Sequence, residues 1–566
     1  MAVNPSFLPF PVPPLKSRNM RIGKKGVLRR SFSVVPDDFF RICQNDILRL
    51  EVEFQEGYPP AKVFLHTNID CHKNEWRDME FTQDTRRNYS LSCKVRRCGR
   101  YTFKLKYTFD DGRTWYWDRV PFSHVIVDPE GVKDIRMYTL IQAVSGTMRD
   151  WADMLPRIKG MGFNAVHLLP ITSLDFSESP YAAYDLFSID GAYCENDKGS
   201  CYDLFEKFVN KARELEIRLC VDLVLNHIGI RSKMVQMCPE WIMPDLSEKD
   251  GMKRAGCWHM NSWLKWGDLV KIYYDHPNPD IRNDIWDYMK KYSLFWAHFS
   301  HLTGGIIRLD NLHSSHEGFM TNLLDELRGA YPDLTVMAEF FTDSNTMLKK
   351  AVEGQINLFL ANQWEYPYAS DLRNYLNYIH GIGRKIRFYL PVTTHDTGVA
   401  AQLFGSAEAV VPRYAVTALM GTGQTGIVQG VEHGYPEKID FIGRKKRYHF
   451  EENARIAEGI TKINQFLAES SAFHRDGNLE FIDGGHGAVL GALRCGERED
   501  EKCYLIFANL DIKNGYCVQV NLSSLSTHTD TVLLEDRMRG GRQEFPVHDL
   551  TIEMEPCGVR IFRIEN

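Results

Sequence analysis

The chain has 566 residues, and its 68 Lys and Arg against 74 Asp and Glu give a formal net charge of −6. This length suggests two to four domains unless a large barrel takes up much of it. The mild acidic balance argues against nucleic acid or a membrane surface as the main partner. The proline-rich N-terminus has no apolar signal core, and no apolar run is long enough to span a membrane. We therefore expect a cytoplasmic protein.

The thirteen cysteines are odd in number and scattered, and no two of them form a Cys-x-x-Cys pair. This usage is typical of reduced thiols rather than of a disulfide framework or a zinc site. The sequence therefore predicts free cysteines.

The N-terminal quarter of the chain divides into two parts. Residues 1–30 are basic and punctuated by proline, which predicts a loosely ordered arm. Residues 31–134 contain short alternating runs separated by turn signals, a pattern typical of a β-sandwich. Trp115, Tyr116 and Trp117 either form a glycan-binding platform or belong to the core or a domain interface. We favour the second interpretation because a sandwich core needs large aromatic side chains.

Residues 135–475 change to alternating strand and helix patterns, which indicate a parallel sheet with crossover helices. Eight apolar runs are strand candidates: 137–143, 164–170, 219–225, 305–310, 334–338, 356–360, 388–392 and 426–429. No glycine-rich phosphate motif follows any of them, so a closed (β/α)8 TIM barrel fits better than an open doubly wound sheet. The fold class is thus α/β.

Two further regions flank or interrupt this barrel. An insertion over residues 228–280, after the third strand, carries several tryptophans with little regular pattern. Residues 476–566 return to alternating runs and predict a C-terminal β-sandwich.

Charged and polar residues gather where four of the barrel strands end. They are Asp222, Asn226 and His227 after the third strand, Arg308, Asp310 and His313 after the fourth, Glu339 after the fifth, and His395 and Asp396 after the seventh. The carboxyl ends of barrel strands meet at one mouth, so we expect these side chains to share a pocket. His167 lies inside a strand and is more simply a satisfied core histidine.

This set suits the cleavage of a glycosidic bond with retention, which needs a carboxylate nucleophile and a carboxylic acid on either side of the bond. Asp310 beside Arg308 should stay ionised, as a nucleophile requires. Glu339 ends an apolar strand and precedes two phenylalanines, surroundings that favour the protonated form of an acid. Asp396 can stabilise an oxocarbenium-like state, and the two imidazoles can bind sugar hydroxyls.

Four segments resemble the four signature regions of the α-amylase superfamily, glycoside hydrolase family 13, and they occur in the same order along the chain. They are VDLVLNH (221–227), IIRLDNLH (306–313), MAEFF (337–341) and TTHDT (393–397). The resemblance covers about residues 135–467 and implies a retaining α-glucan enzyme. It implies Asp310 as nucleophile, Glu339 as acid/base and Asp396 as transition-state stabiliser. Tyr181 and Asp185 in YAAYD match the family's sugar-stacking tyrosine and its nearby aspartate.

The segments around Asp310 and Glu339 are most similar to the glucanotransferase part of glycogen debranching enzymes, where a histidine also takes the place of His313. No helical solenoid like that of the debranching enzymes' glucosidase part is present. Thr397 departs from the commoner asparagine. Asn226 matches a calcium ligand of the family, but no acidic cluster accompanies it, so we expect no metal and no cofactor.

The resemblance makes the expected substrate an α-glucan such as glycogen or a maltooligosaccharide, and makes the N-terminal sandwich similar to a carbohydrate-binding module. We expect a 4-α-glucanotransferase acting on α-1,4 bonds. An α-amylase-type or debranching hydrolase is the alternative, and an inactive glucan-binding protein is a third possibility. Aromatic walls would favour transfer over hydrolysis. Trp241, Trp258, Trp263, Trp266 and Trp364 either supply them or form the insertion's own core. The oligomeric state is left open.

Overall fold

The computed structural model describes residues 20–22, 26–28, 39–54, 59–72, 75–85, 87–117, 122–194, 199–259, 262–383, 385–444, 448, 450–474, 478–482, 486–496, 502–522, 531–548 and 550–565. The chain divides into two compact units, Met1–Glu130 and Gly131–Asn566. Each is described by itself.

The first unit contains two β-sheets around one core. The first sheet has the order β2 (Gly26–Leu28), β1 (Met20–Ile22), β4 (Ile47–Glu53), β8 (Asn88–Lys94) and β7 (Thr82–Gln83). The second has the order β3 (Phe39–Cys43), β11 (Ser123–Asp128), β9 (Gly99–Thr108), β5 (Lys62–Thr67) and β6 (Arg77–Glu80), with β10 (Tyr116–Trp117) paired to β9. Alternate residues of β4, β5 and β9, such as Leu50, Leu65 and Phe103, fill the core between them.

Two sequence predictions differ from this unit. Residues 20–22 and 26–28 form β1 and β2 rather than part of an arm, because β1 pairs in antiparallel register with β2 and β4. The remainder of the predicted arm lies outside the described residues. Tyr116 packs against the core, as the favoured interpretation expects, whereas Trp115 and Trp117 are 38% and 46% exposed and are not core residues.

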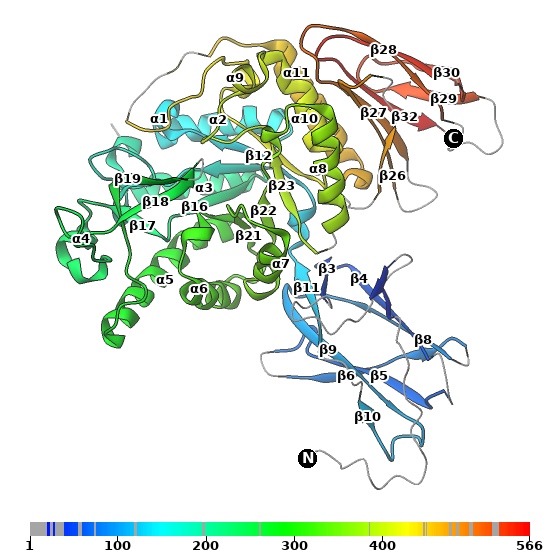
Figure 1. Cartoon of the computed structure of the whole chain (residues 1–566), viewed down its shortest axis with the longest axis horizontal. Helices are drawn as coiled ribbons and strands as arrows, with labels where there is room; N and C mark the ends of the chain where they lie inside the picture. Colours follow the sequence, from blue (N-terminus) through cyan, green and yellow to red (C-terminus); the bar gives the residue numbers. More distant parts are fainter. Residues whose placement is uncertain are drawn as a thin grey trace. The chain divides into compact units, whose positions relative to one another are not determined.

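The second unit is built on a closed eight-stranded parallel barrel, which confirms the predicted fold class (Figure 1). Its strands are β12 (Ile135–Leu140), β13 (Ala165–Leu168), β16 (Arg218–Leu223), β20 (Ile306–Leu309), β21 (Thr335–Ala338), β22 (Leu358–Leu360), β23 (Phe388–Pro391) and β24 (Gln424–Val428). Each of the eight apolar runs in the sequence contains or overlaps one of them. Such continuous burial on both faces is what a parallel strand under helices requires.

Helices follow the barrel strands. They are α1 (Gln142–Ser145), α2 (Met148–Gly160), α3 (Cys201–Glu214), α5 (Pro279–His301), α6 (Glu317–Ala330), α7 (Ser344–Glu353), α8 (Ala369–Ile382), α9 (Ala400–Phe404), α10 (Val410–Leu419) and α11 (Ala454–Glu469). A hairpin of β14 (Thr172–Leu174) and β15 (Ala183–Ile189) follows β13. Trp151 on α2 and Trp296 on α5 are buried in the main core.

The insertion after the third barrel strand has more regular structure than its sequence suggests. It forms a three-stranded antiparallel sheet of β17 (His227–Gly229), β19 (Ser262–Lys271) and β18 (Arg254–His259), with the short helix α4 (Lys233–Met237). Gly256 lets β18 approach β19 closely, since a Cβ there would lie 2.2 Å from the carbonyl oxygen of Leu264.

The C-terminal region contains two antiparallel sheets. One has the order β25 (Leu479–Ile482), β26 (Val489–Cys495), β27 (Cys503–Asn509), β32 (Val559–Glu565), β29 (Thr531–Asp536) and β30 (Arg542–Pro546). The other pairs β28 (Tyr516–Val520) with β31 (Leu550–Met554). A separate hydrophobic cluster that includes Phe507 and Ile552 joins the two sheets.

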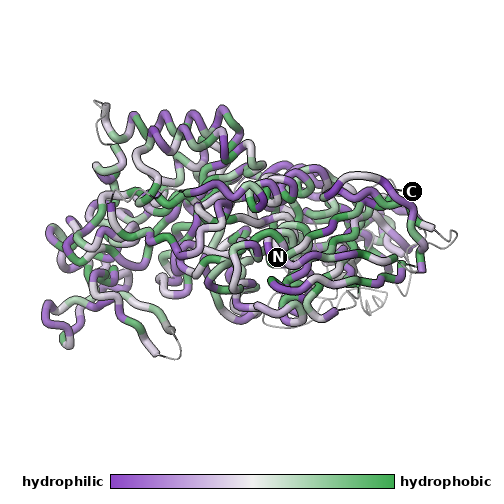
Figure 2. Tube along the Cα trace, turned by 90° about the horizontal axis from the view of Figure 1, so that it is seen from above, coloured by the Kyte–Doolittle hydropathy of each residue, from purple (hydrophilic) through white to green (hydrophobic). Residues whose placement is uncertain are grey.

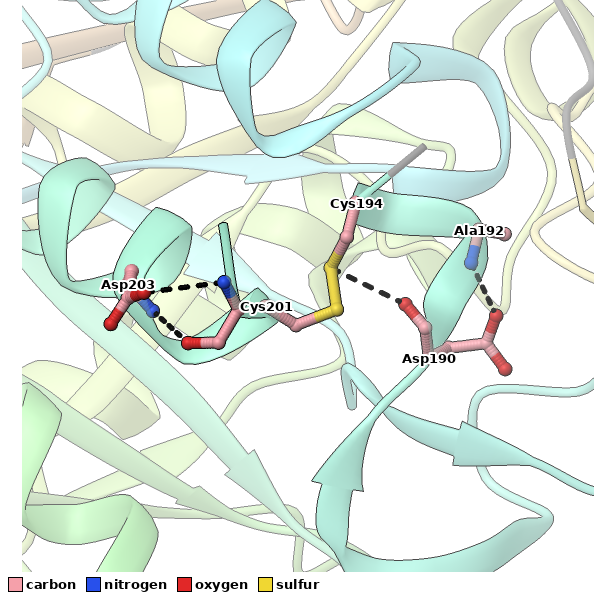
Figure 3. Close-up of a disulfide and its surroundings, with 6 residues drawn as sticks. Asp190, Ala192, Cys194, Cys201 and Asp203 are labelled. Atoms are coloured by element: carbon pink, nitrogen blue, oxygen red, sulfur yellow. Dashed lines mark hydrogen bonds between the residues drawn. A yellow bond between two sulfur atoms is a disulfide. The ribbon is translucent and has the colours of Figure 1, made fainter. Parts of the chain in front are cut away.

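Two disulfides correct the prediction that the cysteines are free. Cys194 is bonded to Cys201, and Cys495 to Cys503, while the other nine cysteines are free thiols. Figure 3 shows the first bridge, which joins the turn after β15 to the start of α3. Both pairs are close in sequence, and a count of scattered cysteines does not detect such local pairs.

Hydrophobic and hydrophilic residues alternate along the trace of the chain (Figure 2). Among the described residues, no helix has both the length and the apolar character needed to cross a membrane.

Candidate active site

The polar residues of the candidate site sit where neighbouring barrel strands end. Asp222 on β16 is the register partner of Arg308 on β20, which brings their side chains to the same level of the barrel. The backbone N–H of Asp310 still donates to Leu223, and that of Glu339 to Leu309, so both residues extend the parallel ladder by one step. Asn311 then adopts a left-handed conformation (φ 46°) and turns the chain away.

The guanidinium of Arg308 holds three carboxylates together. Its Nη1 donates to Asp222 Oδ2 at 2.6 Å and to Asp310 Oδ1 at 3.2 Å, and its Nη2 donates to Glu339 Oε2 at 2.8 Å. Arg308 is 3% exposed, so these are buried, charge-assisted contacts. Asp310 and Glu339 therefore face the same space, each next to a different nitrogen of one side chain.

This arrangement differs from the local pairing that the sequence suggests. Arg308 was expected to serve Asp310, but its shorter contacts go to Asp222 and Glu339. Glu339 was expected in apolar surroundings, yet it also accepts a hydrogen bond of 3.1 Å from the backbone N–H of Asn311. The reason is that partners across neighbouring strands, which the sequence does not show, compete for the guanidinium.

Burial raises the pKa of both Asp310 and Asp222, but their neighbours shift the two groups in opposite net directions. Burial raises the pKa of Asp310 well above its usual range; Glu339 and Asp222 raise it further, and Arg308 opposes them. Burial would also raise the pKa of Asp222, but Arg308 and His167 lower it to about 2. Asp222 thus carries the permanent negative charge that neutralises Arg308, and Asp310 retains a proton more readily.

An aromatic and imidazole wall stands beside the carboxylates. Tyr181 stacks on His395 with ring centroids 5.7 Å apart, and its hydroxyl donates to Asp222 Oδ2 at 2.9 Å. The same hydroxyl lies 2.6 Å from His395 Nε2. Burial lowers the pKa of His395 well below its usual value, so the imidazole is neutral. His167, expected to be a core residue, is buried but also lies 3.4 Å from Asp222.

Asp396 is the most open of the carboxylates, with a half-exposed side chain that lies 3.1 Å from His395 Nε2. Its backbone carbonyl accepts a hydrogen bond of 2.7 Å from Lys438. Phe441 packs edge-on against both Tyr181 and His395. The sequence analysis missed Lys438 and Phe441, since they lie in the loop after the eighth strand and carry no motif.

The remaining predicted residues lie at different places. His227 is buried with its ring edge-on to Trp266, and burial lowers its pKa to about 4. Asn226 is buried in the link between β16 and β17, and His313 is exposed in the turn after Asp310. Asp185 on β15 pairs with Lys233 at 2.6 Å and accepts a hydrogen bond from Ser188.

The tryptophans considered as possible aromatic walls lie in different parts of the second unit. Trp364 forms an edge-to-face pair with Phe341, two residues after Glu339, at a centroid distance of 6.3 Å. Trp266 reaches the His227 side of the site, Trp263 is 41% exposed, and Trp241 packs on Tyr288 of α5. The side chain of Trp258 lies outside the described part of the chain. Within the described residues, no group of three His, Cys, Asp or Glu side chains is arranged to hold a metal ion.

Residues 131–243 match the model of a family described as glycogen debranching enzyme, glucanotransferase domain. The chain is also similar to α-1,4-glucan:maltose-1-phosphate maltosyltransferases. That of Arcanobacterium haemolyticum is 24% identical over 448 residues, 72% of this chain and 60% of the relative. That of Picrophilus torridus is 22% identical over 444 residues, 72% of this chain and 66% of the relative. The chain thus spans less than two thirds of these relatives.

Solved structures share the fold. A maltogenic α-amylase from Thermotoga neapolitana superposes with a TM-score of 0.62 at 19% identity, covering 77% of this chain and 99% of that one. A debranching enzyme from Nostoc punctiforme gives a TM-score of 0.58 at 16% identity, with the same coverage of 77% and 99%. Together with the sequence matches, these findings confirm the predicted resemblance to the α-amylase superfamily and, for the start of the barrel, to the debranching glucanotransferase domain.

Proposed function

We propose that this chain is a retaining enzyme that cleaves α-1,4-glucosidic bonds of glycogen or maltooligosaccharides and transfers the released segment to another glucan, as a 4-α-glucanotransferase. The observation that carries the proposal is the shared guanidinium of Arg308, which places Asp310 and Glu339 at one site. The debranching glucanotransferase match and the maltosyltransferase relatives support transfer as the outcome. An α-glucan hydrolase with the same intermediate is the alternative.

In the first step, Glu339 gives its proton to the glycosidic oxygen while Asp310 attacks the anomeric carbon. The bond to the leaving glucan breaks, and a glycosyl ester with Asp310 forms. In the second step, Glu339 takes a proton from a hydroxyl of the acceptor, whose oxygen displaces Asp310. Burial raises the pKa of Asp310 and Arg308 opposes that rise, so the contact with Arg308 favours the ionised carboxylate that the first step requires.

The surrounding groups position the sugar whose bond is cleaved. Tyr181 offers a ring face held parallel to His395, and Asp396 presents a half-exposed carboxylate to sugar hydroxyls. Asp222 fixes both Tyr181 and Arg308. These contacts preorganise the site before the substrate binds, which lowers the cost of reaching the transition state.

Transfer requires an acceptor sugar to displace water near the intermediate. Phe341 lies two residues after Glu339, is 40% exposed and packs against Trp364 from the segment after β22. An acceptor stacked on this pair would exclude water from the glycosyl ester. We assign this wall to the acceptor side because Phe341 is only two residues from Glu339, which must protonate the leaving oxygen.

Incubation with maltopentaose tests the proposed function. A transferase converts it to a ladder of shorter and longer chains with no net gain of reducing ends, whereas a hydrolase gives only shorter chains and new reducing ends. A binding protein leaves maltopentaose unchanged. A parallel reaction with maltose 1-phosphate and glycogen, followed by release of phosphate, shows whether the donor named for the maltosyltransferase relatives is used here. Shorter chains alone would contradict transfer.

We also propose that the chain is organised as an N-terminal sandwich, a barrel with an insertion and a C-terminal sandwich.

A cytoplasmic location is proposed on the nine free thiols, which are typical of a reducing compartment.

A further inference from the structure

We propose that the outer face of the second N-terminal sheet is a separate α-glucan-binding surface. This aromatic platform consists of Phe64, His66, Trp76, Trp115, Trp117 and Phe122. Its rings come from β5 and β10 and from the residues that precede β6, β10 and β11. Figure 1 shows the neighbouring strands β5, β6, β9 and β10. The identity of the ligand rests on the proposed function of the barrel, and the surface itself does not.

The strands under the platform have an unusual pattern on their outer side. Val63 and Leu65 of β5 point inward and are fully buried, as a sandwich core requires. The outward positions between and after them hold Phe64 and His66, where an exposed strand face normally carries polar residues. Trp117 on β10 and Phe64 on β5 both pair with Lys106 on β9, so the outward residues form one continuous row across three strands.

The flanking segments add aromatic rings to this row. Trp76 stacks on His66 with centroids 4.9 Å apart and planes at 9°, and Trp117 meets the same imidazole edge-on at 5.1 Å. Phe122 packs on Trp76 at 5.6 Å, and Trp115 packs on Phe64 at 5.3 Å. The rings therefore support one another in fixed positions.

The platform remains accessible despite these contacts. Trp76 and Phe122 are each 43% exposed, Trp115 is 38% exposed and Trp117 is 46% exposed. Four large aromatic side chains exposed on one sheet face lower solubility and add no buried area to the core. Such an exposed apolar patch is typical of a binding surface.

Charged side chains are placed among the rings. Lys106 lies 4.7 Å from the ring centroid of Trp115 and pairs with Asp78, and Lys104 lies 5.3 Å from that of Phe122. Asp78 also pairs with His66 at 2.7 Å. Positively charged hydrogen-bond donors and a negatively charged acceptor thus border the ring faces.

This combination fits a glucan better than other ligands. A glucose unit has an apolar face of C–H groups and a rim of hydroxyls, so it needs rings to stack on and both donors and acceptors at their edges. The presence of Asp78 beside the two lysines disfavours a polyanion. The sheet and the barrel belong to one polypeptide. A glucan polymer bound to the sheet would therefore raise the local concentration of glucan chain ends near the barrel site, without any change to that site.

The test compares the full-length protein with its Trp76→Ala/Trp117→Ala double variant. We expect the affinity for glycogen, measured by the retardation of the protein in glycogen-containing native gels, to fall by at least about 10-fold, since two exposed rings on which a sugar could stack are lost. The rate on maltopentaose should stay within about 2-fold, because a short substrate does not need a second surface. Ile47→Ala serves as the matched control, since Ile47 is an exposed apolar residue on the other sheet of the same unit.

Unchanged glycogen retardation in a folded double variant would overturn the proposal. The single Trp117→Ala variant gives the same test if the double variant does not fold, because Trp117 lies on the two-residue edge strand β10. Conversion of a wild-type dimer to a monomer in light scattering, with glycogen retardation unchanged, would show that the platform joins two copies of the chain instead. If maltopentaose is not processed but wild-type retardation still depends on the platform, the proposed function fails while this inference stands.

Discussion

Replacing Arg308 by Lys is expected to lower kcat/KM by at least about 10³-fold and to destabilise the fold by about 3 kcal/mol. The guanidinium contacts Asp222, Asp310 and Glu339 at once, and a lysine ammonium has neither the planar fork nor the reach to hold all three. The variant would remove the shared charged partner of three largely buried carboxylates. Initial rates on maltopentaose and urea denaturation measure the two effects.

Arg254→Lys is the matched control for this variant. Arg254 forms a two-pronged contact with the single carboxylate of Asp250 near the surface of the insertion. Exposed ion pairs contribute about 1 kcal/mol or less, so the control should retain its activity and nearly all of its stability. If Arg308→Lys were as mild as this control, the guanidinium would not be what organises the carboxylates.

The Asp310→Asn variant should lose activity and gain stability. Removing the proposed nucleophile should lower kcat by about 10⁴-fold or more. The pKa of Asp310 is raised in the folded protein, so ionising this buried carboxyl costs folding free energy, and a neutral amide avoids that cost. We expect a melting temperature higher by roughly 1–3 °C at pH 7.

The stability gain should depend on pH in a defined direction. Below about pH 4, Asp310 is protonated in both folded and unfolded chains, and the variant should show no advantage. Above this pH the unfolded chain ionises first, so the wild type loses stability relative to the variant until the folded carboxyl also ionises. Differential scanning fluorimetry across pH 4 to 8 measures this difference.

Asp511→Asn provides a control of opposite sign. Hydrogen bonds from Tyr516, Lys513 and Asn514 lower the pKa of Asp511, so its ionised form stabilises the folded chain. Replacing it should lower the melting temperature at pH 7 and leave the activity unchanged. A wild-type rate in Asp310→Asn, or a stability loss like that of Asp511→Asn, would contradict the account of Asp310.

The barrel was predictable because each of its strands is a short apolar run buried on both faces. The runs 219–225 and 305–310 correspond to β16 and β20 within one or two residues. The insertion was harder to predict: β19 places exposed residues at most of its first positions, so it lacks the alternation that reveals a strand. The two disulfides were missed because cysteine spacing alone does not show local pairing. Cys495 and Cys503, for example, meet only because β26 and β27 pair in the register that places them opposite one another.

In the site, sequence reasoning found the residues but not their partners. Strand-end position was enough to select Asp310 and Glu339, since parallel strands end at one mouth. Which carboxylate receives Arg308 depends on the register between β16, β20 and β21, and the sequence does not encode that register locally. Asp185 was predicted from its motif alone, and its ion pair with Lys233 could not be read from that motif.

The covalent ester on Asp310 is the central claim, and peptide mapping after reaction with maltosyl fluoride tests it most directly. The Glu339→Gln variant is used, because fluoride leaves without an acid while the loss of the base slows the second step, so the intermediate accumulates. Mass spectrometry of the digested protein should find one maltosyl group, attached to Asp310. Attachment to Asp222 or Asp396, or consumption of the fluoride with no modified peptide, would contradict the account.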